Sequence, residues 1–597
     1  MSASTSLLST DPSTQPQQNL RDHILEALSK HPGTREFHVH ALVSAPRRNY
    51  ELYPFAQPRP RVWMQDILVL LSEQPLAGSN SGTNAANGTD ELPPRPSTPP
   101  PRSERPPRVL VSAIEAAMYI VPSTACGILY ISKVDSTGHA SAPSPTAALM
   151  RAVLSYFVDP ATRPAPAREL VRHLYVHVFA RAQGQYLFSG SVDWPGKKPL
   201  TDKGLCAWWR RVLGRVAGEA VAKAEKGKGR SGGEEKLKTK MYYILPGFAA
   251  LEAEHALRIA APAGAPEAAL PAGLQWVYGH PYVQTDGTPL PCPQPPVQPE
   301  EESEGEGGLK RKYLHGNLNL GAIIPSFDDD PKSRFMDEIA YTTDGDVKSP
   351  QRKRARTAVD MVGRAGSGLL PALGNVLAEN AKNGDEGAKE GGGGVPVIVV
   401  AEKEKEKERP LGELGKVTPD EFWERMSFRQ ECVAGAVTGF FTLVVSSSGR
   451  GEGEGSGAPV AAAVLGPQAG QVSGQIHKRI LGTLLTGVEF STAERAAWGT
   501  ETVEGAIRGL CEGGPVPVAA RDRGLLEVPR TPPPRRRGLP AVADVTPNPF
   551  PEAVATASTY TEWIYGRTVT RNAVGVRAEV AGPAVRELAV RRKKKAI

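Results

Sequence analysis

The segment from Gly127 to Phe157 constrains the fold more strongly than any other part of the chain. Residues Gly127–Val134 read GILYISKV, a run of β-branched and aromatic residues that is typical of a strand. A polar turn, DSTG, follows. Ser144 and Pro145 then fit the N-cap and first position of a helix with apolar residues at helical spacing. The segment therefore predicts a strand, a polar loop and a helix in succession.

The start of this predicted helix is suited to an anionic group. The first N–H groups of a helix lack backbone partners and its dipole favours negative charge, so a pyrophosphate would bind well there. Most helix N-termini bind only their own caps, so the local pattern on its own favours a purely structural interpretation.

The composition predicts a folded core that is interrupted by disordered segments. The 597 residues include 61 glycines and 55 prolines, and the aromatic residues, 6% of the chain, are concentrated in a few segments. We expect the folded core at 19–345, with its C-terminal part at 416–515. Disordered tails, insertions or a flexible linker are expected at 1–18, 78–108, 218–236, 284–310, 346–415 and 516–597.

Charge and cysteine usage narrow the functional classes. The net charge of +7 suits transient contact with nucleic acid or chromatin and is too small for a histone-like polycation. Short basic clusters near 310, 352 and 591 fit either nuclear addresses or solvated charge runs. The five cysteines are scattered without CxxC spacing, so neither disulfides nor a metal site is expected. No apolar run reaches the roughly 18 residues that span a membrane.

Three further segments carry distinctive residues. A helix is expected from Thr201, with the adjacent pair Trp208 and Trp209 in its middle. Two neighbouring tryptophans cannot face the same way, so one should pack inward and the other cover a neighbour or a substrate path. The segment 276–282 reads WVYGHPY, and 329–335 reads DDPKSRF, where an Asp-Pro pair is a strong helix start.

In this order, these segments resemble the fungal histone acetyltransferases of the "regulator of Ty1 transposition" family. The resemblance is carried by YISKVDSTG at 130–138, the Trp208-Trp209 pair and DDPKSRF at 329–335. The segments FWER at 422–425 and RQE at 429–431 are similar to a later helix of the family. The resemblance extends over about residues 36–445, broken by the insertions.

The resemblance implies an α/β (α+β) fold with a central mixed β-sheet surrounded by helices and loops, similar to the CREB-binding-protein-type acetyltransferases. It implies transfer of acetyl from acetyl-coenzyme A (acetyl-CoA) to a lysine of histone H3 in the nucleus. Histone H3–H4 and histone chaperones are the implied partners, without direct sequence-specific binding of nucleic acid. A non-catalytic scaffold that binds chromatin or chaperones is the alternative, and a nucleic-acid binder is a weaker third.

The resemblance also assigns roles to residues. An attacking lysine, with an ordinary pKa near 10.4, must lose its proton to a carboxylate or through desolvation. Asp330 is the expected catalytic residue, with Asp329 and Trp276 beside it, and a helix cap is the structural alternative for Asp330. Lys332 matches a lysine that becomes acetylated in the family. Cofactor contacts are expected from Val134, Asp135, Ser136, Pro143, Ser144, Pro145, Thr146, Ala147 and Arg334, the last with a surface ion pair to Asp337 or Glu338 as its alternative.

Overall fold

The computed structural model describes eleven segments and the single residue Phe550. These segments are 18–76, 106–227, 236–261, 270–282, 289–294, 319–343, 346–347, 412–429, 436–448, 465–512 and 552–573. The expectations for 1–17, most of 78–108, most of 284–310 and nearly all of 346–415 lie outside the described residues, as do the three basic clusters.

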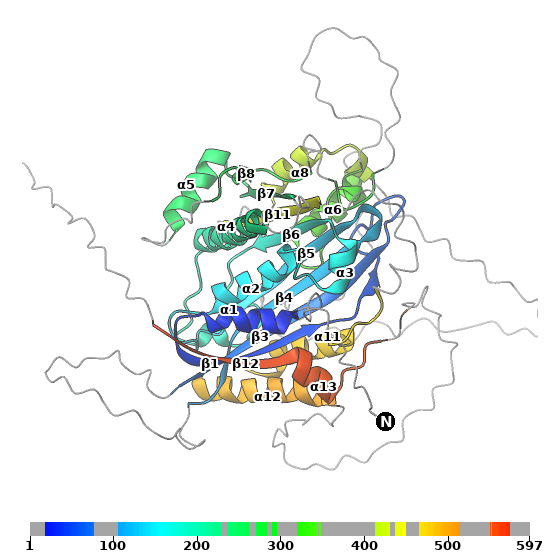
Figure 1. Ribbon diagram of the computed structural model, residues 1–597. Coiled ribbons are helices and arrows are strands. Elements are labelled where there is room, and N and C mark those ends of the chain that lie inside the picture. Colours follow the sequence, from blue (N-terminus) through cyan, green and yellow to red (C-terminus); the bar gives the residue numbers. More distant parts are fainter. Residues whose placement is uncertain are drawn as a thin grey trace, which may run out of the picture.

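A ten-stranded mixed sheet forms the centre of the molecule, which confirms the expected fold class (Figure 1). The strand order is β12-β1-β3-β4-β5-β6-β11-β7-β8, with β2 paired to β3. The pairs β5–β6 and β7–β8 are parallel and the other pairs are antiparallel. The strands are β1 (Gly33–Val43), β2 (Arg47–Asn49), β3 (Val62–Pro75), β4 (Val109–Val121), β5 (Cys126–Ser136), β6 (His173–Ala180), β7 (Lys236–Ile244), β8 (Trp276–Tyr278), β11 (Gly439–Ser448) and β12 (Tyr565–Asn572).

Helices cover both faces of this sheet. In Figure 1, α1 and α2 lie in front of the strands and α12 lies along the bottom of the view. The helices are α1 (Leu20–Ser29), α2 (Thr146–Val158), α3 (Ala165–Leu170), α4 (Asp202–Gly227), α5 (Ala250–Ala260), α6 (Pro331–Tyr341), α8 (Pro419–Met426), α11 (Gly474–Gly482), α12 (Ala493–Glu512) and α13 (Ala557–Thr559). A small separate sheet pairs β9 (Thr342–Thr343) with β10 (Asp346–Val347).

The strand sequences alternate between these two helical layers. In β6, Leu174, Val176 and Val178 pack in the cluster beneath α1, α2 and α4, whereas Tyr175 lies in a cluster on the opposite face. This is the division that the alternation of the sequence predicts. On the opposite face, α11 and α12 cover the β1–β4 half, and α6 and α8 cover the β7–β11 half.

The two parallel strands β5 and β6 separate at their carboxyl ends. Their pairing runs from Cys126 opposite His173 to Ile131 opposite Val178, after which β5 continues to Ser136 beside β4 alone. The crevice beyond the carboxyl ends of parallel strands is a common place for ligands, at the point where the neighbouring strands diverge. Beside this point, the register of β4 and β5 shifts at Ser132, which is a β-bulge.

The C-terminal part of the chain contains a strand that the sequence does not predict. Within the segment 516–597, for which mostly disorder is expected, β12 pairs along its whole length with β1. Its sequence, YGRTVTRN, is too polar to identify a strand locally. β12 is held by contacts with β1, which lies far away in the sequence. One of these contacts is the ion pair between Arg567 and Glu36 at 3.0 Å.

Two helix boundaries also differ from the sequence-based expectation. Helix α4 continues to Gly227, so the first part of the expected insertion 218–236 is helical. The reason is its composition of alanine, glutamate and lysine, all strong helix formers. Helix α2 begins at Thr146 with Pro145, not Ser144, as its N-cap.

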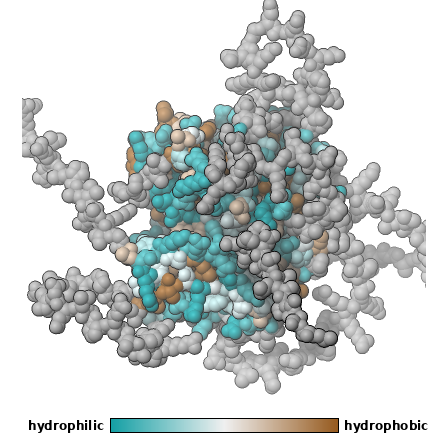
Figure 2. All heavy atoms as spheres, in the orientation of Figure 1, coloured by the Kyte–Doolittle hydropathy of each residue, from teal (hydrophilic) through white to brown (hydrophobic). Residues whose placement is uncertain are grey.

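The described surface is largely polar. Figure 2 shows mostly hydrophilic residues on the visible face, with small hydrophobic patches between them. Within the described ranges, no helix combines the length and the apolar character that crossing a bilayer requires.

Candidate active site

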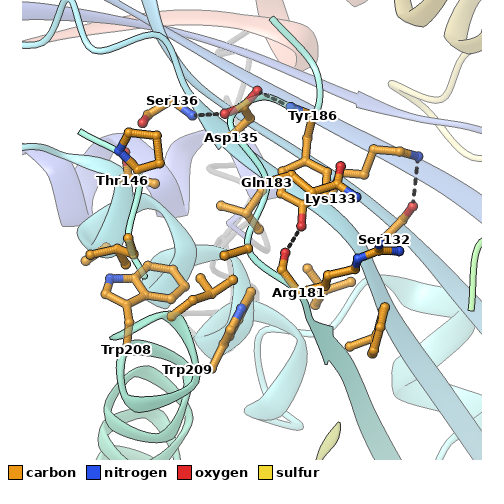
Figure 3. A pocket seen from close by; sticks show the side chains of 18 of the residues that line it. Ser132, Lys133, Asp135, Ser136, Thr146, Arg181, Gln183, Tyr186, Trp208 and Trp209 are labelled. Carbon is orange, nitrogen blue, oxygen red and sulfur yellow. Dashed lines mark hydrogen bonds between the residues drawn. The ribbon is translucent and has the colours of Figure 1, made fainter. Parts of the chain in front are cut away.

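A cavity of about 1040 Å³ lies where β5 and β6 separate. Its walls come from the carboxyl half of β5, the start of α2, the loop after β6, the first half of α4 and the turn before α6. Figure 3 shows Asp135 and Ser136 at one side of it, Lys133 at another, and Trp208 and Trp209 on α4 below them. Segments that lie far apart in the sequence therefore share one space.

Asp135 fixes one wall of this cavity. Its Oδ2 accepts hydrogen bonds from the backbone N–H groups of Tyr186, Leu187 and Phe188, at 2.7, 2.9 and 3.2 Å. Its Oδ1 accepts a hydrogen bond from the Ser136 N–H (Figure 3). The same oxygen pairs with Lys197 Nζ at 2.9 Å. Both members of this ion pair are 5% exposed. The Asp135 carboxylate is thus fully engaged in anchoring the loop after β6, and its charge is balanced by Lys197.

The start of α2 and several cations form the polar part of the wall. Ser144 Oγ lies 3.5 Å from the Thr146 N–H, at the outer limit of a hydrogen bond, so the first-turn N–H groups remain available to an anion. Positive side chains from three other elements also line the cavity, namely Arg181, Lys197, Lys198 and Arg334. Lys198 and Arg334 are exposed, so their charges face both solvent and the cavity.

The tryptophan pair on α4 forms an apolar wall. Trp209 is 4% exposed and belongs to the core, whereas Trp208 is only partly buried. Their rings meet edge to face, with centroids 4.8 Å apart, and both line the cavity. The expected division of roles between the two side chains is confirmed.

Asp329 faces the cavity and is held by Lys133. Lys133 Nζ lies 2.9 Å from Asp329 Oδ2 and 2.8 Å from Glu115 Oε2. The Asp329 side chain is 37% exposed, whereas that of Lys133 is 9% exposed. Burial alone would lower the pKa of Lys133, but the two carboxylates outweigh it and raise the pKa. Lys133 is therefore a fixed cation.

Asp330 points away from the cavity. It is fully buried, and its Oδ1 accepts a hydrogen bond from the Lys332 N–H at 2.9 Å, so it is the N-cap of α6. Its Oδ2 pairs with Lys332 Nζ at 2.6 Å. The Lys332 ammonium is surrounded by aromatic rings, the nearest being Phe440 at 4.8 Å from the ring centroid. The predicted cap is confirmed.

A second, much smaller cavity lies beside Lys332. Its volume is about 10 Å³, room for about one water molecule. His177 also lines it, and burial together with the Lys332 ammonium holds the pKa of His177 well below its usual value. His177 is therefore a neutral imidazole, with Nδ1 3.2 Å from Thr442 Oγ1. In the parts of the chain that the structure describes, no group of three or more potential metal ligands gathers.

Comparison with known proteins gives the family. Residues 166–505, more than half of the chain, match the family described as "Histone acetyltransferase KAT11-type domain". The chain belongs to this family. The KAT11-type match begins within α3 and ends within α12. It includes α4 and the turn before α6, but not β5, the strand that carries Lys133 and Asp135.

Two curated relatives are named histone acetyltransferase rtt109. The chain is 29% identical to that of Aspergillus flavus over 354 residues, which is 58% of this chain and 46% of the relative. It is 33% identical to that of Schizosaccharomyces pombe over 126 residues, which is 20% of this chain and 31% of the relative. The matches thus span less than half the length of either relative. The crystal structure of Rtt109 from Aspergillus fumigatus aligns with a TM-score of 0.49 at 20% identity, over 92% of this chain and 99% of that one.

The structure brings together part of the predicted site of this KAT11-type protein. Of the predicted residues, those that line the cavity are Val134, Asp135, Ser136, Ser144, Thr146, Ala147, Asp329 and Arg334. Pro143, Pro145, Asp330 and Lys332 are not among its lining residues. Glu338, a possible partner of Arg334 from the sequence, pairs with Arg429.

Trp276 also lies away from the cavity. It packs edge to face on Tyr243 and Phe441, at 5.9 and 6.0 Å between ring centroids, in the layer beneath α4. Lys332, the ion-pair partner of Asp330, lies on the opposite side of the sheet, over the ring of Phe440. From the WVYGHPY segment, His280 and Tyr282 reach the small cavity beside Lys332 instead. The sequence order of the segment could not show which of its aromatic residues would do so, because the chain leaves β8 after Tyr278 and changes direction at Gly279, which has a positive φ.

Sequence reasoning missed Lys133. A charged residue inside the apolar strand GILYISKV was a visible signal, because a lysine in a buried strand needs an acidic partner. Its partners, Glu115 and Asp329, come from two other elements and could not be paired with it from the sequence.

Proposed function

We propose that this protein transfers acetyl from acetyl-CoA to a lysine side chain of histone H3, in the nucleus and on H3–H4 presented by histone chaperones. The observation that carries the proposal is the single cavity shared by the SKVDSTG strand end and Asp329. A wall suited to a cofactor and an acidic group border one shared space, as a transfer between two bound substrates requires. The names of the relatives support histone as the acceptor.

The residues present fit an acyl-CoA. We assign its phosphates to the exposed Lys198 and Arg334 and to the first turn of α2, at Thr146 and Ala147. Val134 and Ser136 line the adjacent β5 wall, and Trp208 supplies an apolar surface. Bound acetyl-CoA supplies the activated thioester. In this assignment, Asp135 acts indirectly, by holding the loop after β6 in place.

We assign the carboxylate that receives the lysine to Asp329 rather than to the neighbouring Asp330. Asp329 faces the cavity, so an incoming ammonium can reach it, whereas the Asp330 carboxylate is enclosed by its own helix and by Lys332. Asp329 would attract and orient the ammonium and accept its proton directly or through water. Asp330 contributes by fixing the turn that presents Asp329. Trp276 is left with a packing role in β8.

We also propose that Lys332 is acetylated, and the geometry around its amine sets a condition for this modification. The Lys332 side chain is 4% exposed and its amine is bound to Asp330, and the adjacent space holds about one water molecule. Modification therefore requires the Asp330–Lys332 pair to open first, and the product would lack the charge that pairs with Asp330.

An acetylation assay tests the proposed function. The full chain is incubated with H3–H4 and radiolabelled acetyl-CoA, with and without a histone chaperone, and Asp329→Asn is compared with wild type. We expect kcat to fall about 10²- to 10⁴-fold in Asp329→Asn. Glu254→Gln removes an exposed carboxylate on α5, away from the cavity, and serves as the matched control.

Two outcomes would overturn the proposal. Equal incorporation by wild type and Asp329→Asn would remove the role of that carboxylate. Absence of transfer by wild type, together with binding of H3–H4, would favour the non-catalytic scaffold. Filter binding to DNA over a salt series tests the nucleic-acid alternative, which requires steeply salt-dependent binding.

A further inference from the structure

The β-bulge at Ser132 changes the face of the sheet on which Lys133 lies. Before the bulge, Leu129 and Ile131 face the layer of α2 and α4, whereas Ile128 and Tyr130 face the opposite layer. In a regular strand Lys133 would follow Leu129 and Ile131. The register shift pairs it directly with Glu115 of β4, a residue on the opposite face. One extra residue thus re-aims the lysine toward the side where α6 begins.

On that side Lys133 joins two acidic groups. Its Nζ contacts Glu115 at 2.8 Å, Asp329 at 2.9 Å and Ser132 Oγ at 3.3 Å. These contacts use all three protons of an ammonium group. Glu115 and Lys133 are mostly buried and belong to two paired strands, so both are fixed by the sheet. Asp329 is the more exposed member and precedes α6 on an irregular turn.

We propose that Lys133 is a positioning residue that holds Asp329 against the cavity wall, with Glu115 as its anchor. This inference rests on the proposed function of Asp329 and deepens it. Asp330 is tied to its own helix through Lys332, whereas Asp329 is tied to the rigid strand that also forms the cofactor wall. The bulge therefore sets the distance between the Asp329 carboxylate and the acetyl-CoA that we assign to the cavity.

The test uses the full chain in four forms: wild type, Lys133→Met, Asp329→Asn and the double variant. Steady-state rates are measured with H3–H4 and acetyl-CoA. We expect Lys133→Met to lower kcat/KM for the histone by about 10- to 100-fold, because Asp329 is no longer held. The KM for acetyl-CoA should change less than twofold. The double variant should be no slower than Asp329→Asn, because Lys133 acts through that residue. Lys133→Arg should recover part of the loss, and Lys30→Met, at the exposed C-cap lysine of α1, is the control.

The melting temperatures of the same four proteins give a readout that does not depend on activity. If Lys133 and Asp329 are in contact, the loss in the double variant should be smaller than the sum of the single losses. Additive melting losses, or a wild-type kcat/KM in Lys133→Met, would overturn the inference while wild-type acetylation persists. An inactive wild type would instead count against the proposed function, and the melting cycle would still decide whether the contact exists.

Discussion

Replacing Asp330 by asparagine should lower the free energy of unfolding of this protein, even though the shape of the side chain is almost unchanged. Asparagine is as good an N-cap as aspartate, so α6 keeps its cap. What is lost is the charge opposite Lys332, whose side chain is 4% exposed. The remaining neighbours of its ammonium are aromatic rings, at 4.8 Å for Phe440 and 5.7 Å for Phe327.

The magnitude follows from the burial of that ammonium. Breaking one partner of a buried ion pair costs about 3–5 kcal/mol, because the other charge stays desolvated. Cation–π contacts return about 2 kcal/mol at most, and they are already present in the wild type. We therefore expect the free energy of unfolding to fall by about 3–5 kcal/mol, a change of two to three and a half powers of ten in the unfolding equilibrium.

Urea unfolding followed by tryptophan fluorescence measures this change. The informative control is Asp330→Asn with Lys332→Met, which removes both charges and should recover most of the loss, since uncharged replacements of buried pairs are often neutral or stabilising. Peptide mass analysis at Lys332 accompanies the measurement, because an acetylated lysine carries no charge. A loss below about 1 kcal/mol in Asp330→Asn with an unmodified Lys332 would refute the reasoning.

Three more predictions follow from buried polar groups and from strand pairing. Asp135→Asn should raise the KM for acetyl-CoA and destabilise the fold by about 3–5 kcal/mol, as measured by kinetics and urea unfolding, because Lys197 loses its buried partner. Burial lowers the pKa of His40 to about 3, so only the unfolded form gains a proton between pH 6.5 and that value. Stability should therefore fall as the pH drops below 6.5, by about 2 kcal/mol at pH 5 for this residue, and a His40→Asn variant should show a shallower decline. Deleting 552–573 should expose the edge of β1, and hydrogen exchange should show faster exchange of β1 amides without loss of protection in β6.

The sequence predicts the elements well where one face of a strand or helix is apolar. The alternation in β6 and the spacing in α2 and α6 lead to the observed burial, and the Asp-Pro pair marks the cap at Asp330. These are local patterns whose physical cause lies within a few residues, which is why they can be read directly.

Features that depend on distant partners escape such reasoning. The sequence YGRTVTRN has no local pattern that predicts the pairing of β12 with β1. The bulge at Ser132 can be recognised only from the pairing of β5 with β4. The difference between Asp329 and Asp330 is of the same kind. Adjacent carboxylates look equivalent in the sequence, and only their lysine partners, Lys133 and Lys332, separate an exposed group from an enclosed one.

The pairing of β12 with β1 has a consequence for synthesis on the ribosome. Glu36 and Arg567, which meet across this pair, are 531 residues apart in the chain. At a translation rate of about 5–20 residues per second, roughly 25 to 110 seconds pass between the synthesis of β1 and that of β12. During that interval a long strand presents unpaired N–H and C=O groups, a template for adhesion between nascent chains. Production of this protein should therefore depend on cellular factors that shield an open sheet edge until translation reaches β12.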